Sequence, residues 1–430
     1  MSSQASRRAV IVGGVRTPFV RAFAEFLELD TIALGTAAVR GLLERTRVPH
    51  HAIDAIVWGG VILPGLSPNV GREIALDLKL PSSVEGMTVT RACASGLQAI
   101  TSAASAIERG DADVIIAGGS DSTSNAEIKL PQKLVHAAAP LAFGKATPAD
   151  VLGLLSTLMP ITDVLPRMPK IAERTTGQVM GEAAEEMARR NEIPRAAQDE
   201  LAARSHHRAA AAIARGRFAD EIVPVKTPSG AWVHGDTIVR GDTSVDRLAK
   251  LRPVFAKDGT LSAGNSTPLT DGASAVLLMS EERAKALGLR PLAALKSWSY
   301  VGVDPGDQLL IGPAIAMPRA LDRAGLTLDQ IDLIDIHEAF AAQVLCVLKM
   351  LASDGFAQAR LGKERAVGAV PVDKLNVLGG SIAFGHPFGA TGARMVTTMA
   401  NELAATGKRT ALLGICAAGG LGAAAVLERI

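Results

Sequence analysis

Residues 87–119 read MTVTRACASGLQAITSAASAIERGDADVIIAGG, and residues 374–414 read KLNVLGGSIAFGHPFGATGARMVTTMANELAATGKRTALLG. Both segments predict the same order, from a short strand through a special turn and an Ala-rich helix into a buried strand. The segments that precede them also match, because residues 39–61 and 318–340 each predict an amphipathic helix, a polar connection and an apolar strand. A chain that repeats this order predicts two αβ halves with two similar sheets packed together.

Continuous apolar runs predict the strands of both halves, since strands covered on both faces have this pattern. They are Ala9–Val12, Ile56–Val61, Thr88–Thr90, Val114–Ala117 and Ala273–Met279 in the first half, and Leu292–Trp298, Leu333–Ile336, Lys374–Val377, Thr410–Ile415 and Ala423–Glu428 in the second. Residues 126–258 carry many prolines and no clean alternation, which predicts an inserted loop domain. The expected halves are therefore residues 1–125 with about 259–288, and residues 289–430.

The composition indicates a globular α/β chain and excludes several classes of function. A hydrophobic fraction of 48% is too high for a disordered chain. Aromatic residues make up only 3% and the net charge is +2, so nucleic-acid binding is not indicated. The 3 cysteines form neither a disulfide framework nor a CxxC pair, and no metal is expected. No signal peptide or spanning helix is indicated, which predicts a cytoplasmic protein.

Cys93 stands between a short alternating strand and an Ala-rich helix. A thiol at a helix N-terminus lies near the positive end of the helix dipole, so we expect its pKa below the usual ~8.5. Gly96, one turn into the helix, would let another backbone or a ligand approach closely. The alternative is a buried structural thiol, the commonest state of a free cysteine.

Three further segments carry candidate catalytic groups. His386 lies in the Gly-rich loop GGSIAFGHPFGATGAR, residues 379–394, which could fix an imidazole as a general base. Cys416 ends an apolar strand in GICAAGGLGAA, and α/β sheets place reacting groups at strand ends. His337 follows a buried strand in DIHEAFAAQ, without the second histidine of a zincin motif. Because no P-loop or dinucleotide glycine spacing occurs, nucleotide hydrolysis and hydride transfer are not favoured.

Together these four segments resemble the thiolases over essentially the whole chain, and VGGVRTPFVR, MGEAAEEMA and LRPVFAKDGTLSAGNSTPLTDGASA extend the resemblance. The family implies duplicated αβαβα halves in five layers, an inserted loop domain, and a homodimer or homotetramer. It implies Cys93 as the acyl-accepting nucleophile, His386 as the base that activates it, and Cys416 as the acid/base at the α-carbon. His337, where many thiolases have Asn, would serve one oxyanion hole. The backbone N–H groups of Cys93 and Ala418 would form the other.

The resemblance also implies a channel for coenzyme A, which is a substrate here, so no cofactor is expected. Thr267 and Met180 stand where the family contacts pantetheine, and Phe340 would line the same channel. Arg240 matches a family residue near the adenosine end. The expected ligands are therefore coenzyme A and acyl-CoA.

The subtype is indicated by HEAF in place of NEAF, by SYVGVDPGDQLLIGPAIA and by the long insertion. These features resemble the β-subunits of fatty-acid β-oxidation complexes, which implies thiolytic cleavage of 3-ketoacyl-CoA by a ping-pong mechanism. They also imply a hydratase/dehydrogenase α-chain as a candidate partner. The apolar stretch Val151–Met159 could contact an acyl tail, a membrane surface or a partner, or could pack inside the loop domain.

Three alternatives to this subtype stay open. An acetoacetyl-CoA thiolase working in the condensing direction would use the same residues. A decarboxylating ketoacyl synthase would typically carry His where Cys416 stands. A lipid-binding relative without activity should have lost Cys93 or His386, and this chain has kept both.

Overall fold

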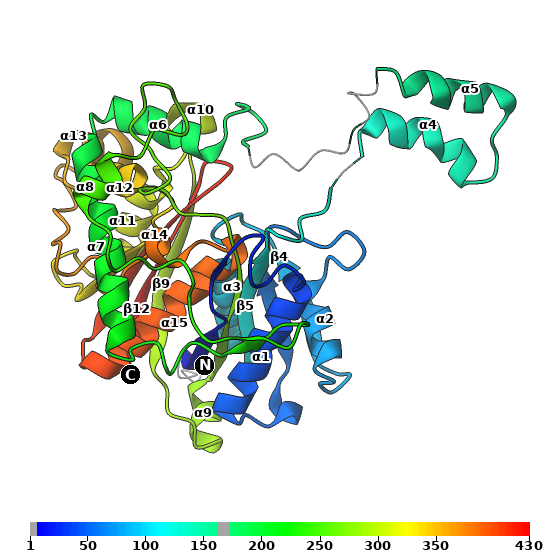
Figure 1. The fold of residues 1–430 in the computed structure, drawn as a ribbon. Helices are drawn as coiled ribbons and strands as arrows, with labels where there is room; N and C mark the ends of the chain where they lie inside the picture. Colours follow the sequence, from blue (N-terminus) through cyan, green and yellow to red (C-terminus); the bar gives the residue numbers. More distant parts are fainter. Residues whose placement is uncertain (1–6, 129, 161–164, 166–171) are drawn as a thin grey trace. The chain divides into compact units, whose positions relative to one another are not determined.

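The computed structural model describes residues 7–128, 130–160, 165 and 172–430 (Figure 1). The chain divides into two compact units, one of residues 1–125 with 172–430 and one of residues 126–171. This division falls inside the stretch 126–258 that we expected to form a loop domain. The domain boundaries drawn from the sequence therefore stay a prediction.

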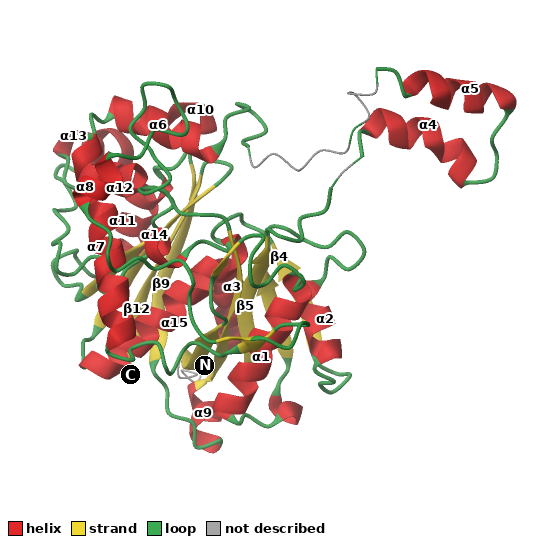
Figure 2. Cartoon of the chain, in the orientation of Figure 1, coloured by secondary structure: helices red, strands yellow, loops and turns green. Residues whose placement is uncertain are grey.

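The larger unit is built on one mixed sheet, in the order β10-β11-β12-β9-β1-β8-β5-β3-β4, with β2 beside β8 (Figure 2). The strands are β1 (Ala9–Arg16), β2 (Val20–Arg21), β3 (Ala55–Gly59), β4 (Glu85–Val89), β5 (Val114–Ser122), β8 (Thr270–Ser280), β9 (Ala293–Gly302), β10 (Leu333–Ile336), β11 (Thr410–Ala417) and β12 (Leu421–Arg429). A separate pair consists of β6 (Val225–Lys226) and β7 (Trp232–Val233). The two expected sheets join at one edge, where β1 pairs with β9.

Helices cover the sheet in layers. They are α1 (Thr31–Thr46), α2 (Val70–Asp77), α3 (Ser95–Arg109), α4 (Gln132–Ala142), α5 (Pro148–Thr157), α6 (Met180–Arg190), α7 (Arg195–Ala214), α8 (Val245–Ala249), α9 (Glu281–Ala286), α10 (Pro305–Gln308), α11 (Gly312–Ala324), α12 (Ala341–Leu351), α13 (Asp354–Phe356), α14 (Ser381–Phe384) and α15 (Phe388–Thr406), with the short turns η1 (His50–Ala52) and η3 (Ala357–Leu361).

Three buried hydrophobic clusters separate these layers. Helices α1 and α2 pack on the outer face of the first half, and α11 and α12 pack on the outer face of the second. Helices α3 and α15 lie between the two halves, where their apolar residues share one cluster with strands of both. The order helix, sheet, helix, sheet, helix is the five-layered α/β fold that the resemblance implied.

One predicted strand is wrong. Lys374–Val377 is reduced to a single bridge between Ile334 and Leu375, whereas each of the other predicted strands overlaps an observed strand. The reason is Asn376, whose φ of 45° lies in the left-handed region and ends extended backbone. Its side chain replaces the strand pairing, because it accepts from the N–H of Ile336 at 2.8 Å and donates to the same residue's carbonyl at 2.9 Å.

The unit of residues 126–171 contains α4 and α5, and neither helix has a buried residue. Helix α5 begins with a capping box between Thr147 and Asp150, which satisfies its first N–H groups. Within this unit the stretch Val151–Met159 has exposed apolar side chains, among them those of Leu152 and Leu155. Across the described ranges, no helix combines the length and apolar character that crossing a bilayer requires.

Candidate active site

Cys93 lies in the tight turn between β4 and α3. Ala92 has a φ of 46°, a conformation that residues other than glycine rarely adopt. The hydroxyl of Ser95 closes the turn, because it accepts from the N–H of Arg91 and donates to the carbonyl of Ala92, both at 2.7 Å. Helix α3 then begins at Ser95 without a side-chain cap. The turn thus places Cys93 just outside the helix N-terminus.

The N-terminal turns of α3 and α15 touch through glycines. A Cβ on Gly96 would lie 2.4 Å from the carbonyl oxygen of Gly389, and one on Gly392 would lie 2.5 Å from the backbone nitrogen of Leu97. This confirms the expected close approach at Gly96. The contact brings the turn before α3 against the turn before α15.

His386 stands in that second turn and is buried. Its Nδ1 is hydrogen-bonded to the hydroxyl of Thr391 at 2.6 Å, and its backbone N–H donates to the hydroxyl of Thr270 at 2.8 Å. Its Nε2 is buried and has no hydrogen-bond partner in the described part of the chain. Burial, with a smaller contribution from the charge of Arg394, lowers the pKa of His386 to about 3. The imidazole is therefore neutral, with Nε2 free to act.

His337 follows β10 and is also buried. Its ring centroid lies 4.1 Å from that of His386, and its Nδ1 lies 2.9 Å from the hydroxyl of Ser381. Burial and the neighbouring His386 and Arg394 hold its pKa well below the usual range. Because Arg394 donates to the Ser381 oxygen at 3.2 Å, that hydroxyl can give its own proton to Nδ1. Nε2 of His337 then carries the hydrogen.

The four predicted catalytic side chains come together. The sulfur of Cys93 and one ring nitrogen each of His337 and His386 all lie within 4.8 Å of one another. Cys416 is buried at the end of β11, where burial and the nearby Cys93 raise its pKa well above the usual range. The N–H of Ala418 donates to the sulfur of Cys93. The site thus combines two thiols, two imidazoles and a backbone donor.

The pKa of Cys93 contradicts our expectation. Although the residue is partly exposed, protein atoms surround the sulfur, and burial raises its pKa to about 12. The N–H groups of Ala418 and of Cys93 itself lower it only in part, while the nearby carboxyl of Asp121 raises it. The helix dipole is therefore outweighed by desolvation. Without substrate, the pair of Cys93 and His386 is a neutral thiol beside a neutral imidazole.

Sequence reasoning missed the residues that hold this cluster in place. Arg394 forms a buried ion pair with Asp335 at 3.0 Å. Buried Glu338 accepts from the side chains of Ser205 at 2.7 Å and Asn376 at 2.6 Å. Arg394 at the end of the Gly-rich segment was one available signal, but its partner Asp335 is 59 residues away in the sequence.

A carboxylate from another segment of the chain holds the turn that carries Ala418. The N–H of Gly419 donates to the carboxylate of Glu173 at 3.0 Å. Gly419 and Gly420 have φ values of 81° and 66°, which only glycine adopts readily. Glu173 therefore fixes the glycine turn beside the predicted oxyanion donor.

The predicted coenzyme A residues are only partly assembled. The hydroxyl of Thr267 donates to the carbonyl of Ser381 at 2.7 Å, and the side chain of Ser381 is the hydrogen-bond partner of His337. Phe340 packs edge-on against Phe255, with ring centroids 5.7 Å apart. Arg240 is exposed and does not join the cluster.

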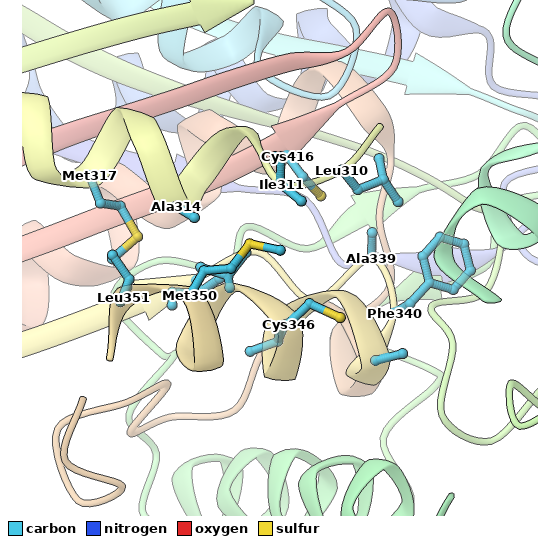
Figure 3. Packing of buried hydrophobic residues seen from close by; sticks show 14 of the residues in the cluster. Leu310, Ile311, Ala314, Met317, Ala339, Phe340, Cys346, Met350, Leu351 and Cys416 are labelled. Carbon is cyan, nitrogen blue, oxygen red and sulfur yellow. The ribbon is translucent and has the colours of Figure 1, made fainter. Parts of the chain in front are cut away.

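Phe340 and Cys416 belong to one buried hydrophobic cluster (Figure 3), and Met180, at the start of α6, packs against it. Cys346 lies in the same cluster on α12, where its sulfur lies 3.5 Å from the carbonyl oxygen of Met187. Burial raises the pKa of Cys346 to about 12. This third thiol is a packing residue.

Two family models and several known proteins match this chain over most of its length. The family model described as "Thiolase, N-terminal domain" matches residues 9–282, and "Thiolase, C-terminal domain" matches residues 289–429. The chain is 45% identical over 429 residues to the 3-ketoacyl-CoA thiolase of Vibrio cholerae serotype O1, covering 99% of this chain and 98% of that one. It is 45% identical over 423 residues to the 3-ketoacyl-CoA thiolase of Serratia proteamaculans, covering 98% and 97%.

Solved structures are also similar. The Bacillus anthracis acetyl-CoA acetyltransferase matches with a TM-score of 0.84 and 33% identity, covering 100% of both chains. Human mitochondrial 3-ketoacyl-CoA thiolase in complex with CoA matches with a TM-score of 0.84 and 28% identity, covering 99% of this chain and 98% of that one.

Proposed function

The chain belongs to the thiolase family, and on that premise we propose that it is a 3-ketoacyl-CoA thiolase of fatty-acid β-oxidation. It would cleave 3-ketoacyl-CoA with coenzyme A, yielding acetyl-CoA and a shortened acyl-CoA. The observation that carries the proposal is the cluster of Cys93, His337 and His386 within 4.8 Å, beside Cys416. Full-length identity of 45% to 3-ketoacyl-CoA thiolases supports the subtype.

The first step is acyl transfer to Cys93. Nε2 of His386 takes the thiol proton, and the sulfur attacks the β-keto carbon of the substrate. The N–H groups of Cys93 and Ala418 then bind the oxyanion, a role supported by the Ala418 hydrogen bond to the sulfur. Because thiol and imidazole are both neutral at rest, proton transfer must be coupled to attack.

Cleavage follows when the oxyanion collapses and the bond between the α- and β-carbons breaks. The electron pair leaves as the enolate of acetyl-CoA, and Nε2–H of His337 stabilises its oxygen. The thiol of Cys416, whose pKa is raised by burial, donates its proton to the α-carbon. A neutral thiol is the form that this step requires.

The second half-reaction restores the enzyme. Transfer of a proton from His386 to the Cys416 thiolate first returns both groups to their neutral forms. His386 then takes the proton of an incoming coenzyme A thiol, whose sulfur attacks the thioester on Cys93. The Cys93 thiolate leaves and takes this proton from His386, which releases the shortened acyl-CoA. We assign Thr267, Met180 and Phe340 to the pantetheine channel on the family resemblance. Arg240 is exposed, which suits a contact at the adenosine end.

Kinetics across chain length test the proposal. A longer acyl tail buries more apolar surface, worth ~0.8 kcal/mol per methylene when fully sheltered. Two additional methylenes would then raise kcat/KM for thiolysis by about tenfold. A preference for acetoacetyl-CoA over every longer substrate would instead support the acetoacetyl-CoA thiolase, which the match to the Bacillus anthracis acetyltransferase keeps as the second candidate.

Exposed apolar residues on α4 and α5 support a further role for the unit 126–171. We propose that Leu155 and its neighbours in Val151–Met159 bind an α-chain, with a membrane surface or acyl tail as the competing occupants. Leu155→Asp should abolish complex formation while leaving chain-length preference intact, measured by co-purification and thiolysis kinetics. Loss of chain-length preference without loss of the complex would instead assign the stretch to the acyl tail. Lost vesicle binding alone would assign it to a membrane.

We also propose a homodimer or homotetramer in the cytoplasm. The bacterial relatives support that compartment, and all 3 cysteines are free thiols, as expected where disulfides are kept reduced. Light scattering of the purified chain tests the oligomeric state, and a monomer at all concentrations would contradict it.

A further inference from the structure

We propose that Cys93, His337 and His386 also form a binding site for zinc, and that zinc inhibits the enzyme reversibly by ligating the nucleophile. One thiolate and two neutral imidazoles are a donor set that zinc prefers. No metal motif is present in the sequence, because these ligands come from three segments that only the fold brings together.

The distances favour this site. One sulfur and two nitrogens lie within 4.8 Å of one another. Metal–ligand bonds of about 2.0–2.3 Å need ligand atoms roughly 3.5 Å apart in tetrahedral geometry. Small side-chain movements would therefore bring the three donors onto one ion. The fourth position would be held by water.

Both imidazoles have a hydrogen bond at Nδ1, as metal-binding imidazoles usually do, but His337 must change its tautomer to bind a metal through Nε2. Each Nδ1 is hydrogen-bonded to a hydroxyl, that of Ser381 for His337 and that of Thr391 for His386. Each Nε2 is buried and lacks a partner among the residues that the structure describes. Such outer hydrogen bonds fix the ring and the tautomer of a metal-binding histidine. To bind zinc through Nε2, His337 would adopt the tautomer with its hydrogen on Nδ1. This N–H would donate a hydrogen bond to the Ser381 oxygen.

Zinc would bind and inhibit through the same bond, the one between the metal and the Cys93 sulfur. The sulfur of Cys93 forms a bond to zinc and its proton goes to solvent, without any change of oxidation state. Zinc then occupies the lone pair that would attack the substrate. An acylated Cys93 has no thiolate to offer, so prior acylation should protect the enzyme from zinc.

His337 distinguishes this site from that of the many thiolases that carry Asn at the same position, because an amide is a poor zinc ligand. His337→Asn therefore tests the proposal with a side chain that the family tolerates. Zinc affinity should fall by more than about 100-fold, since loss of even an outer hydrogen-bond partner costs 10–100-fold. Cys93→Ser should cause a loss of the same order.

The experiment titrates zinc ions into the substrate-free enzyme by calorimetry, with cobalt as a spectroscopic substitute. We expect one zinc per chain, a sulfur-to-cobalt charge-transfer band, and loss of both in Cys93→Ser. Cys346→Ala, which removes the distant thiol, should leave zinc affinity unchanged. Binding that persists in Cys93→Ser and His337→Asn would overturn the proposal, because it would place the metal elsewhere.

Inhibition is measured separately, as thiolysis at rising zinc concentration relative to each variant's own zinc-free rate. Wild type should lose activity, regain it with a chelator, and resist zinc after incubation with an acyl-CoA donor. Zinc binding does not depend on the proposed thiolase activity, so failure of one is distinguishable from failure of the other. Binding without inhibition would overturn the claim that zinc ligates the nucleophile.

Discussion

The two halves of the chain each have a tight turn before a central helix, α3 or α15, but the two turns carry different chemical groups. In the first half the turn before α3 carries Cys93, and in the second the turn before α15 carries His386. The first turn depends on Ala92 in the left-handed region, whereas the second uses Gly385 with a φ of 96°. Because the two helix starts are in contact, duplication brings a thiol and an imidazole together.

Equivalent positions of the two halves hold the same residue where it supports the backbone, and different residues near the candidate active site. Asp54 accepts from the N–H groups of Asp113 and Val114, where β5 begins, at 2.7 and 2.8 Å. Asp332 does the same at the start of β11, at 2.8 and 3.1 Å. Five residues further on, the first half has Gly59 and the second has His337. The two halves therefore share a structural frame, and they differ in the residues that we propose as catalytic.

The largest effect should come from the one catalytic side chain of the first half. Cys93→Ser should lower kcat by more than about 10⁴-fold, because loss of a nucleophile removes the covalent route. Mass spectrometry of the wild type should show a labile acyl adduct on Cys93 after incubation with substrate. An adduct on Cys346 instead would contradict the assignment.

Cys416 tests the contribution of the second half. Cys416→Ala should still acylate at Cys93 from an acyl-CoA donor. Exchange of the acetyl methyl protons into deuterated water should fall by ~10²–10⁴-fold, the usual contribution of a general acid/base. Unchanged exchange, followed by nuclear magnetic resonance, would remove Cys416 from the proton transfer.

The pH dependence of alkylation tests whether the Cys93 thiol, beside the His386 imidazole, is neutral in the substrate-free enzyme. Because the pKa of Cys93 is raised to about 12, its thiolate fraction should increase roughly tenfold per pH unit throughout the neutral range. Iodoacetamide labelling of the substrate-free enzyme should follow this slope up to about pH 9. A plateau near the ordinary thiol pKa of ~8.5 would mean that the helix dipole prevails.

Gly59 tests why the first half has no counterpart of His337. A Cβ there would lie 2.5 Å from the backbone carbon of Ser95, in the Cys93 turn. Gly59→Ala should cost about 1–3 kcal/mol of unfolding free energy through overpacking and should also lower activity. Urea denaturation measures it, with Gly302→Ala as the control, since that Cβ meets nothing within 4 Å. Equal stability of both variants would refute the steric explanation.

The smallest effect should come from the two equivalent aspartates. Asp54→Ala and Asp332→Ala should each cost about 1 kcal/mol, because each removes the acceptor of two backbone N–H groups that solvent can partly satisfy. Thermal unfolding of both variants should give similar shifts. A clear difference between the two shifts would show that the aspartates do not stabilise the two halves in the same way.

The sequence by itself determined most of the fold and named the side chains that we propose as catalytic. Repeated periodicity predicted the duplicated halves, and the motifs around Cys93, His386 and Cys416 named groups that the structure brings together. These signals are local, since strand patterns and turn residues depend on neighbours along the chain. The same locality explains the error at Lys374–Val377, where a side chain from Asn376 replaced a strand.

Only the tertiary structure decided the state of those groups. Burial reversed the expected direction of the Cys93 pKa, because desolvation depends on atoms that come from every layer of the fold. The tertiary structure also decided that the hydroxyls of Ser381 and Thr391 orient the two imidazoles, and that Glu173 holds the glycine turn after Ala418. These contacts join residues from separate segments, and no pattern along a single segment specifies which will meet.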